Sequence, residues 1–589
     1  MHPLPEYPRP ALRRDSFESL NGLWQYAFTK AAQFPTAWDG TIRVPYSPEA
    51  PASGVRRTLQ PGEWLHYHRG FTPPAGQGGR VLLHFGAVDY ACAVEVNGHL
   101  AGGHRGGYWP FTLDITDYLR PGRNTLWVAV QDPTGNGTQA RGKQTLTPGG
   151  MFYHAQSGIW QTVWLERVPD NYITELTVTP DYDARTVTVK AHTAQPGGAK
   201  NLWAVVRAGG VTIAEDWGGD EADQDGEVTL NLPEKHFFPW SPDSPFLYDL
   251  TVGTTQGDED GFDTVHSYFA LRKWSCEPDA KGILRFCLNG KPILLNGLLD
   301  QGYWPEGLYT PPSDAAVVHE LEQVKELGFN LLRKHAKIEP QRWYYHCDKL
   351  GLIVWQDMVN GGGKMNQWYV TYLTNALLPL LRHTPDARPL WGLLGRETEA
   401  SRESYQTELK ATVEALRCHP CIGCWVPFNE GWGQFDARAA TVALRALDDT
   451  RLIDEASGWY DQGGGDVDSR HNYFYPLRIR PGGRTVALSE YGGIAWPMPG
   501  HEPPGKTYGY GTAKDKADLT KRYKMLQWKT ILPQLGRGLS ALVYTQLTDV
   551  EDEVNGLFTY DRTALKPEAA AVRSCNAALA AEFAKVTAK

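Results

Sequence analysis

Two glutamates that closely follow short apolar runs are the side chains of this sequence best placed for acid–base or nucleophilic chemistry. Glu430 lies in Pro427-Phe-Asn-Glu-Gly-Trp-Gly433 and Glu490 lies in Leu488-Ser-Glu-Tyr-Gly-Gly493. The glycines beside each would let a bulky ligand approach the backbone. Two carboxyl groups about 5–5.5 Å apart perform retaining glycoside hydrolysis, in which one is the nucleophile and the other acts as acid and then as base. Other chemistry stays open from these two residues alone.

Further polar residues follow other apolar runs, where they could complete a site. They are Asn296, Arg333, His335, Asp357, Asn429, His471 and Tyr473. A nearby Tyr hydroxyl and an Arg would hold a nucleophilic carboxylate in its ionised form. Each residue taken singly also has a purely structural explanation, because an acid at the end of a strand often only caps the following helix.

These residues belong to a region, residues 273–589, in which short apolar runs alternate with helical patterns. Runs such as Phe329–Arg333, Leu352–Asp357 and Cys421–Phe428 predict strands. Apolar residues at three- and four-residue steps predict helices over 314–327 and 401–417. Alternating βα units of this kind predict a (β/α)8 TIM barrel, in which the carboxyl ends of the strands build the site.

Two β-rich regions precede the predicted barrel. Residues 1–168 contain short alternating strands closed by turn residues, such as Ala91–Val96 before Asn97-Gly98, and predict a jelly-roll-like antiparallel β-sandwich. Residues 169–272 repeat this style on a smaller scale and predict an immunoglobulin-like β-sandwich. The expected fold class is therefore multidomain, β plus α/β.

Charge and composition limit the expected partners. The 589 residues carry a formal net charge of −9, which argues against nucleic acid and anionic membranes, because both require a basic face. Residues 1–16 lack the apolar stretch of a signal peptide, and no run approaches the roughly 18 apolar residues of a membrane span. We therefore expect a cytoplasmic protein without membrane contact.

Three of the eight cysteines form a cluster, Cys418-His-Pro-Cys-Ile-Gly-Cys424. This spacing is compatible with an iron–sulfur or zinc site. However, Cys421 and Cys424 fall in a predicted strand, where they would point to opposite faces. Free cysteine is a small core residue, so we expect free thiols, no metal site and no cofactor. A redox or metal protein remains a rival hypothesis from a different class.

Tryptophan is unusually frequent, with 21 Trp against 19 Phe and 6 Met. Such flat aromatic side chains suit β-sheet cores and also stack on the apolar faces of sugars. Five are expected in cores: Trp24, Trp127, Trp160, Trp164 and Trp240. Four follow predicted barrel strands, where we expect stacking on a sugar: Trp304, Trp368, Trp432 and Trp496. The long loops 358–399 and 491–513 are expected to roof a pocket for a terminal sugar, to form a homo-oligomer interface, or both.

Motifs along nearly the whole chain resemble glycoside hydrolase family 2, the group of β-galactosidases, β-glucuronidases and β-mannosidases. Phe17–Trp24, Trp64–Phe71 and Gly158–Trp164 resemble the family's sugar-binding sandwich. Phe238–Tyr248 resembles its immunoglobulin-like domain, and Leu288–Gly297 resembles the beginning of its barrel. The resemblance implies a hydrolase that acts on a carbohydrate substrate without a cofactor.

The resemblance also implies a role for each motif residue. Asn429-Glu430 matches the family's Asn-Glu pair, which makes Glu430 the acid/base and Asn429 a partner of the sugar's 2-hydroxyl. Glu490 matches the nucleophile, which Arg333 and Tyr473 would support. The remaining expected substrate-binding residues are His335, Asp357, His471, Trp432 and Trp496. The tight Arg333-Lys-His335 spacing leaves the place of His335 open.

Departures from the family pattern bear on the substrate. The chain lacks the Glu-x-His cluster of the metal-dependent β-galactosidases, and residues 492–506 contain no Asn-x-Lys triplet of the kind that β-glucuronidases use to bind the sugar carboxylate. We therefore expect a retaining exo-β-glycosidase, with β-galactosidase as the first hypothesis. Other sugars of the family (glucuronide, mannoside, galactofuranoside or arabinoside) and a non-catalytic carbohydrate-binding protein remain alternatives.

Overall fold

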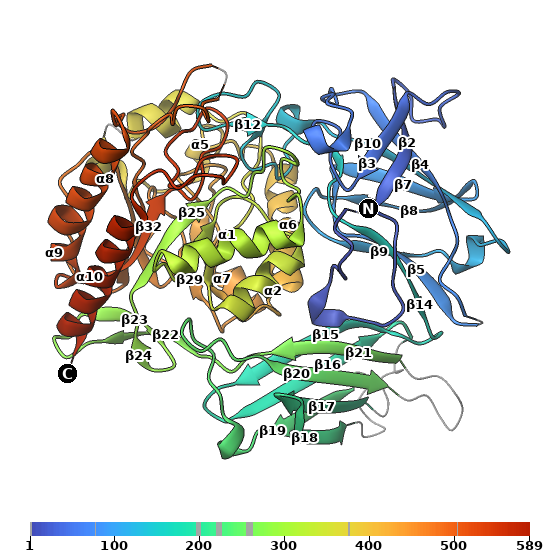
Figure 1. The fold of residues 1–589 in the computed structure, drawn as a ribbon, viewed down its shortest axis with the longest axis horizontal. Helices are drawn as coiled ribbons and strands as arrows, with labels where there is room; N and C mark the ends of the chain where they lie inside the picture. The colour runs from blue at the N-terminus through green and yellow to red at the C-terminus, as the bar shows by residue number, and fades with distance from the viewer. Residues whose placement is uncertain are drawn as a thin grey trace.

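The computed structural model describes residues 3–76, 78–195, 202–218, 226–254, 263–374, 377–503 and 505–588. These residues form two β-sandwiches that pack beside an α/β barrel (Figure 1). The fold class predicted from the sequence is confirmed. None of the described helices is long and apolar enough to cross a lipid bilayer.

The barrel is a single sheet of eight strands. In pairing order the strands are β29 (Leu452–Ile453), β28 (Ile422–Val426), β27 (Ile353–Asp357), β26 (Leu331–Lys334), β25 (Leu295–Asp300), β32 (Leu539–Thr545), β31 (Thr485–Gly492) and β30 (Val467–Asn472). Their pairs are parallel. Between β29 and β30 the Asp466 amide donates a hydrogen bond to the Ile453 carbonyl at 2.8 Å, which joins the two ends of the sheet. All carboxyl ends therefore meet at one rim.

Helices surround the barrel strands. The longer ones are α1 (Asp314–Glu326), α2 (Gln341–Leu350), α6 (Glu399–Leu416), α7 (Ala437–Leu447), α8 (Lys516–Met525) and α10 (Ala569–Thr587). Helix α1 begins after Ser313, whose hydroxyl accepts a hydrogen bond from the Ala316 amide, and α6 begins in the same way after Thr398. These N-caps satisfy amides that have no partner within the helix.

The first sandwich consists of two antiparallel sheets. One sheet pairs β1 (Glu18–Ser19), β14 (Val163–Val168), β5 (Arg80–Phe85) and β9 (Phe111–Asp114). The other pairs β3 (Gly40–Val44), β2 (Gly22–Thr29), β4 (Trp64–Phe71), β10 (Asn124–Gln131), β7 (Ala91–Val96) and β8 (His99–Arg105). Their facing apolar side chains form one buried cluster, as period-two alternation requires.

The second sandwich is smaller. One sheet pairs β15 (Ile173–Asp181), β16 (Thr186–Thr193) and β19 (Glu227–Asn231), and the other pairs β18 (Val211–Gly218), β17 (Leu202–Ala208), β20 (Tyr248–Thr254) and β21 (Asp263–Phe269). A short antiparallel sheet of β22 (Trp274–Pro278), β23 (Leu284–Leu288) and β24 (Lys291–Pro292) then leads into the barrel.

A buried carboxylate ties the N-terminal segment to both sandwiches. Glu166 of β14 is fully buried and accepts hydrogen bonds from Arg14 at 3.0 Å and from the Trp164 indole at 2.9 Å. Arg14 also pairs with Asp263 of the second sandwich at 2.6 Å. Burial opposes ionisation of Glu166, but the charges of Arg9, His84 and Arg14 outweigh it and hold its pKa well below the usual value.

Candidate active site

A pocket at the carboxyl ends of the barrel strands contains both glutamates. Its lining residues are Lys143, Met151, Leu299, His335, Asn429, Glu430, Trp432, Tyr473, Glu490, Tyr510, Thr545 and Glu553. Most come from the barrel, whereas Lys143 and Met151 come from the first sandwich. Most of the barrel residues lie at or just beyond the end of a parallel strand, which is how the barrel positions them, whereas Tyr510 and Glu553 come from the loops after β31 and β32.

Glu490 lies within β31 and is 5% exposed. One of its carboxylate oxygens accepts a hydrogen bond from Arg333 at 3.2 Å, and the other accepts one from the Tyr473 hydroxyl at 2.6 Å. Burial opposes its ionisation, but the charges of His471 and Arg333 outweigh burial and lower the pKa of Glu490 to about 2. Glu490 is therefore an ionised carboxylate at neutral pH, as a nucleophile requires.

Arg333 at the end of β26 connects several of the polar residues expected in the site. Its guanidinium donates two hydrogen bonds to Asp357, each of 3.0 Å, and one of 2.8 Å to the Asn429 side-chain carbonyl. Asp357 also contacts Nδ1 of His335 at 2.7 Å. This rigid fork fixes Asn429 relative to Glu490, because a guanidinium binds in a planar geometry.

Glu430 follows β28 at the same rim. Its backbone has φ +50°, a conformation that is uncommon for residues other than glycine and that often occurs at functional sites. The Glu430 amide donates to the Ser457 carbonyl at 3.0 Å, which holds this turn in place. A Glu430 oxygen lies 2.8 Å from Nδ1 of His471, and that nitrogen lies 3.6 Å from a Glu490 oxygen.

The two glutamates face each other across a short gap. One oxygen of Glu430, one oxygen of Glu490 and a ring nitrogen of His471 all lie within 4.8 Å of one another. Such closeness matches the spacing of about 5–5.5 Å in retaining glycosidases and leaves no room for the water that the wider, inverting arrangement places between its carboxyl groups. The pair can therefore act on the two sides of one glycosidic bond.

The glycines beside Glu430 have a different role from the one predicted. Gly431 and Gly433 have φ values of +75° and +63°. A side chain on Gly431 would clash with the Tyr460 ring, and one on Gly433 would clash with the Gly361 carbonyl. These glycines are required by the turn and by protein packing rather than by the approach of a ligand.

The tryptophans expected on the catalytic side separate in the structure. Trp432 lines the pocket and stacks on Phe152 with ring centroids 5.2 Å apart. Trp496 instead lies in a separate small core with Ala513 and Leu519, so its expected contact with a sugar has no support in this geometry. Trp304 lies beneath the guanidinium of Arg562, outside the lining of this pocket.

Trp368 was expected to stack on a sugar and the two long loops to roof the pocket, and the structure supports this only in part. Trp368 is 63% exposed and does not belong to the pocket lining. Among the residues of the loop 491–513 that the structure describes, only Tyr510 lines the pocket, where it stacks on Tyr473 with ring centroids 4.0 Å apart. No residue of the loop 358–399 that the structure describes belongs to that lining. The roof is therefore narrower than the one predicted.

Asn296 does not belong to the site. Its strand, β25, begins at Leu295 and ends at Asp300, so Asn296 lies near the amino end of the strand rather than at the catalytic rim. There its side-chain amide nitrogen donates a hydrogen bond to the side-chain carbonyl of Asn576 in α10 at 3.0 Å. The prediction was wrong because it ended the apolar run at Asn296, whereas the strand continues through Leu298 and Leu299.

Sequence reasoning did not select several residues of the pocket. Lys143, Met151, Thr545 and Glu553 were all missed. Thr545 ends barrel strand β32, so a complete assignment of strand ends would have found it. Lys143 and Met151 reach the pocket only through packing between domains, and no local pattern in the sequence marks them.

The cysteine cluster does not form a metal site among the residues that the structure describes. The one group there with three converging ligand atoms is Glu430, His471 and Glu490, the catalytic candidates themselves. Cys421 and Cys424 are buried, and their thiols contact the carbonyl oxygens of Tyr344 and Trp425, both at 3.6 Å. Burial raises the pKa of both thiols, which makes them poor nucleophiles.

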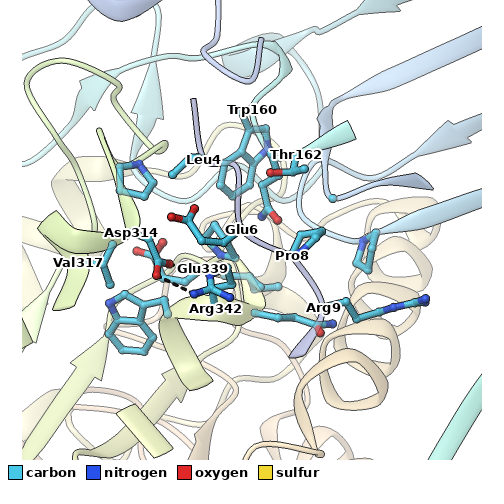
Figure 2. Close-up of a pocket in the computed structure, with 18 of the residues that line it drawn as sticks. Leu4, Glu6, Pro8, Arg9, Trp160, Thr162, Asp314, Val317, Glu339 and Arg342 are labelled. Carbon is cyan, nitrogen blue, oxygen red and sulfur yellow. Dashed lines mark hydrogen bonds and ion pairs between the residues drawn. The ribbon is translucent and has the colours of Figure 1, made fainter. Parts of the chain in front are cut away.

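A larger, more apolar pocket lies away from this chemistry, between the N-terminal segment, the first sandwich and the barrel. Figure 2 shows Leu4, Glu6 and Pro8 on one side of it and Asp314 and Val317 on another. None of the residues that line this pocket lines the site of Glu430 and Glu490. The two glutamates expected to react therefore lie in the smaller pocket at the barrel rim.

A (β/α)8 barrel with two glutamates at this separation, one ionised and held by an arginine and a tyrosine, defines the class of retaining glycosidases. Comparisons with known proteins agree. Family models match residues 54–161 (glycosyl hydrolase 2 galactose-binding domain-like), 171–272 (glycosyl hydrolases family 2) and 282–473 (glycosyl hydrolases family 2, TIM barrel domain). Together these matches cover more than half of the chain. The chain belongs to glycoside hydrolase family 2.

Individual relatives differ in the sugar that their names give. A β-galactosidase of Thermoanaerobacter pseudethanolicus is 24% identical over 451 residues, which are 72% of this chain and 53% of the relative. A putative β-glucuronidase of Formosa agariphila is 26% identical over 311 residues, 51% of this chain and 35% of the relative. The chain thus spans about a third to a half of the length of these curated relatives.

Solved structures match over almost their whole length. A β-D-glucuronidase of Dictyoglomus thermophilum has a TM-score of 0.72 at 18% identity and covers 97% of this chain and 98% of its own. A β-galacturonidase of Eisenbergiella tayi has a TM-score of 0.69 at 17% identity, with 98% and 99% covered. At these identities the likeness shows the common fold.

Proposed function

We propose that this chain is a retaining exo-β-glycosidase that removes a terminal sugar by double displacement, with a β-galactoside as its first candidate substrate. The observation that carries the proposal is the pair of oxygens of Glu430 and Glu490 within 4.8 Å, together with the ionised state of Glu490. The contacts of Arg333 and Tyr473 to Glu490 argue against a non-catalytic binding protein, because a binding site does not need a carboxylate held for attack.

The proposed reaction has two steps. In the first, the Glu490 carboxylate attacks the anomeric carbon while Glu430 donates its proton to the leaving oxygen, which departs as an alcohol. In the second, Glu430 accepts a proton from water, and the water oxygen displaces Glu490 and leaves the sugar with its original anomeric configuration. The Asn429 amide nitrogen is the donor available to the 2-hydroxyl, since its carbonyl already accepts from Arg333.

Two observations support the exo mode and the sugar. The pocket is bounded by Lys143 and Met151 of the first sandwich as well as by the barrel residue Tyr510, and so small a pocket suits a single terminal sugar. A β-galactosidase is among the curated relatives that cover about three quarters of the chain. Glucuronidase and galacturonidase structures share the fold, so the experiment below must distinguish between the candidate sugars.

Replacement of the nucleophile provides the test. We expect Glu490→Gln to reduce hydrolysis of 4-nitrophenyl β-galactoside by more than a thousandfold, and we expect azide to restore turnover of Glu490→Ala and to give a glycosyl azide of inverted configuration. Glu582→Gln is a matched control, because Glu582 of α10 is partly exposed and does not line the pocket. Wild-type rates in Glu490→Gln would refute the proposal, as would failure of the wild type to hydrolyse any member of a panel of galactoside, glucuronide, mannoside, galactofuranoside and arabinoside.

A further inference from the structure

One lysine from outside the barrel reaches the catalytic pocket. Lys143 precedes β11 (Gln144–Thr145) in the first sandwich, and its carbonyl accepts a hydrogen bond from the Tyr153 amide at 3.0 Å, which anchors its backbone. Its side chain lines the same pocket as Glu430 and Glu490. Lys143 is only 7% exposed, so the walls of the pocket enclose most of its side chain.

This ammonium group has no charged partner among the residues that the structure describes. Its nitrogen lies 5.6 Å from the centroid of the Tyr153 ring and 5.9 Å from that of Trp432. It donates no hydrogen bond to, and forms no ion pair with, any described side chain. The nearby Glu553 carboxylate instead accepts hydrogen bonds from the Tyr153 hydroxyl and from Asn555.

Three other buried lysines of the chain show the usual arrangement. Lys334 pairs with Asp300 at 2.5 Å, Lys337 with Glu339 at 2.8 Å and Lys566 with Asp549 at 2.7 Å. Such pairing is expected, because an isolated charge is costly to remove from water. Lys143 departs from this pattern in the pocket in which the proposed reaction takes place.

We infer that Lys143 determines specificity by binding a carboxylate of the substrate, which places a uronic acid glycoside ahead of the neutral β-galactoside named above as the preferred substrate class. This inference rests on the function proposed above. An ammonium inside a pocket forms a charge-assisted hydrogen bond to a carboxylate, and such bonds are roughly twice as strong as neutral ones. The contact is supplied by the first sandwich, so it does not require the Asn-x-Lys triplet that is absent from residues 492–506.

The carboxylate could belong to the terminal sugar or to the leaving group, and substrates distinguish the two sources. The terminal position is tested with 4-nitrophenyl β-galacturonide and β-glucuronide against the neutral β-galactoside. The leaving-group position is tested with a disaccharide in which galactose is linked to glucuronic acid. We expect the higher kcat/KM for the glycosides whose terminal sugar is a uronic acid, because Lys143 lines the small pocket of the glutamates.

Variants of Lys143 test the contact itself. We expect Lys143→Met and Lys143→Gln to lower the ratio of kcat/KM for the uronide to that for the galactoside on the order of 100-fold, the scale on which a buried charge pair loses a partner. Lys143→Arg keeps a positive charge, so it should lower this kcat/KM ratio less than Lys143→Met and Lys143→Gln do. Lys30→Met is the matched control in the same sandwich, because Lys30 is an exposed residue paired with Glu63, and it leaves the ratio unchanged.

A measurement that does not depend on turnover accompanies these rates. Free galacturonate is expected to inhibit the wild type more strongly than galactose does, and Lys143→Gln removes that difference. If the galactoside is hydrolysed and neither the uronide preference nor the inhibition by galacturonate depends on Lys143, the inference is overturned and the proposed function stands. If no glycoside of the panel is hydrolysed, the proposed function itself fails.

Discussion

The hydrogen bond from Tyr473 to Glu490, the proposed nucleophile, offers the sharpest test of how the site controls charge. Removal of the hydroxyl in Tyr473→Phe keeps the ring and its stacking on Tyr510, and it deletes the 2.6 Å contact to Glu490. A hydrogen bond to a charged group contributes about 1.5–3 kcal/mol. Its loss therefore destabilises the ionised carboxylate relative to the protonated one.

The size of the expected change in the pKa of Glu490 follows from the other groups around this carboxylate. Burial raises its pKa, and the charges of His471 and Arg333, which this variant retains, contribute more to lowering it than the Tyr473 hydroxyl does. We therefore take the low end of the range, which at 1.36 kcal/mol for each pH unit corresponds to about one unit. The pKa of Glu490 should rise from about 2 in the wild type by about that amount in Tyr473→Phe.

The assay is the pH dependence of kcat/KM for an aryl glycoside, whose acid limb reports ionisation of the free enzyme's nucleophile. Because the pKa of Glu490 is lowered in the folded protein, activity is present above that value and is lost as the pH falls through it. We expect the acid limb of Tyr473→Phe to lie about one pH unit higher. Enzyme held at each pH and returned to neutral pH must recover its activity, which separates titration from unfolding.

Tyr508→Phe is the matched control for this experiment. The Tyr508 hydroxyl donates to the Tyr510 hydroxyl at 3.4 Å and contacts no carboxylate that the structure describes, so its removal should leave the acid limb in place. An acid limb of Tyr473→Phe that coincides with the wild type would refute the electrostatic account of Glu490. A shift of equal size in Tyr508→Phe would show that the effect is not specific to the hydrogen bond.

Two further predictions concern buried arginine partners. Arg333→Lys should lower kcat/KM by about 100-fold or more, because one ammonium group cannot replace the two hydrogen bonds to Asp357 and the contacts to Asn429 and Glu490. Steady-state kinetics measures this loss, and an unchanged unfolding midpoint shows that the variant is folded. A loss smaller than tenfold contradicts the prediction. Glu166→Gln should reduce the free energy of unfolding by about 3 kcal/mol, because it leaves Arg14 with one of its two anionic partners. Because the pKa of Glu166 is lowered in the folded protein, its contribution to the free energy of unfolding is complete above the pKa of the unfolded state and disappears as the pH falls. Urea titrations of the wild type and of Glu166→Gln should therefore give free energies of unfolding that converge in acid. A difference that stays constant with pH contradicts the prediction.

The sequence predicts the residues of the site that are local to a barrel strand. Arg333 and Glu490 lie in strands whose order around the barrel follows their order along the chain, so recognising alternating βα units is enough to place them at one rim. Asn296 shows the limit of this reasoning, since an error of a few residues in the end of a strand moves a side chain from one end of the barrel to the other.

Residues that depend on tertiary packing escape prediction for a physical reason. Lys143 lies in the first sandwich, 287 positions before Glu430 along the chain, and only the docking of the two domains brings it into the pocket. Trp496 has the residue type and the loop position expected of a side chain that stacks on a sugar, yet it packs with other apolar residues in a small separate core. Hydrophobic burial competes with ligand stacking for the same aromatic surface, and the outcome depends on neighbours that are distant in sequence.

The unequal surroundings of the two glutamates account for their different proposed roles. Glu490 is approached by Arg333 and Tyr473, whereas the described contact of the Glu430 carboxylate is His471. The oxygens of the two carboxyl groups lie within 4.8 Å of each other, so in the proposed first step Glu490 can attack the anomeric carbon while Glu430 donates a proton to the leaving oxygen. In the proposed second step the same Glu430 carboxylate accepts a proton from the water that displaces Glu490 from the glycosyl ester. One pair of carboxyl groups at this separation therefore accounts for both steps of the proposed double displacement.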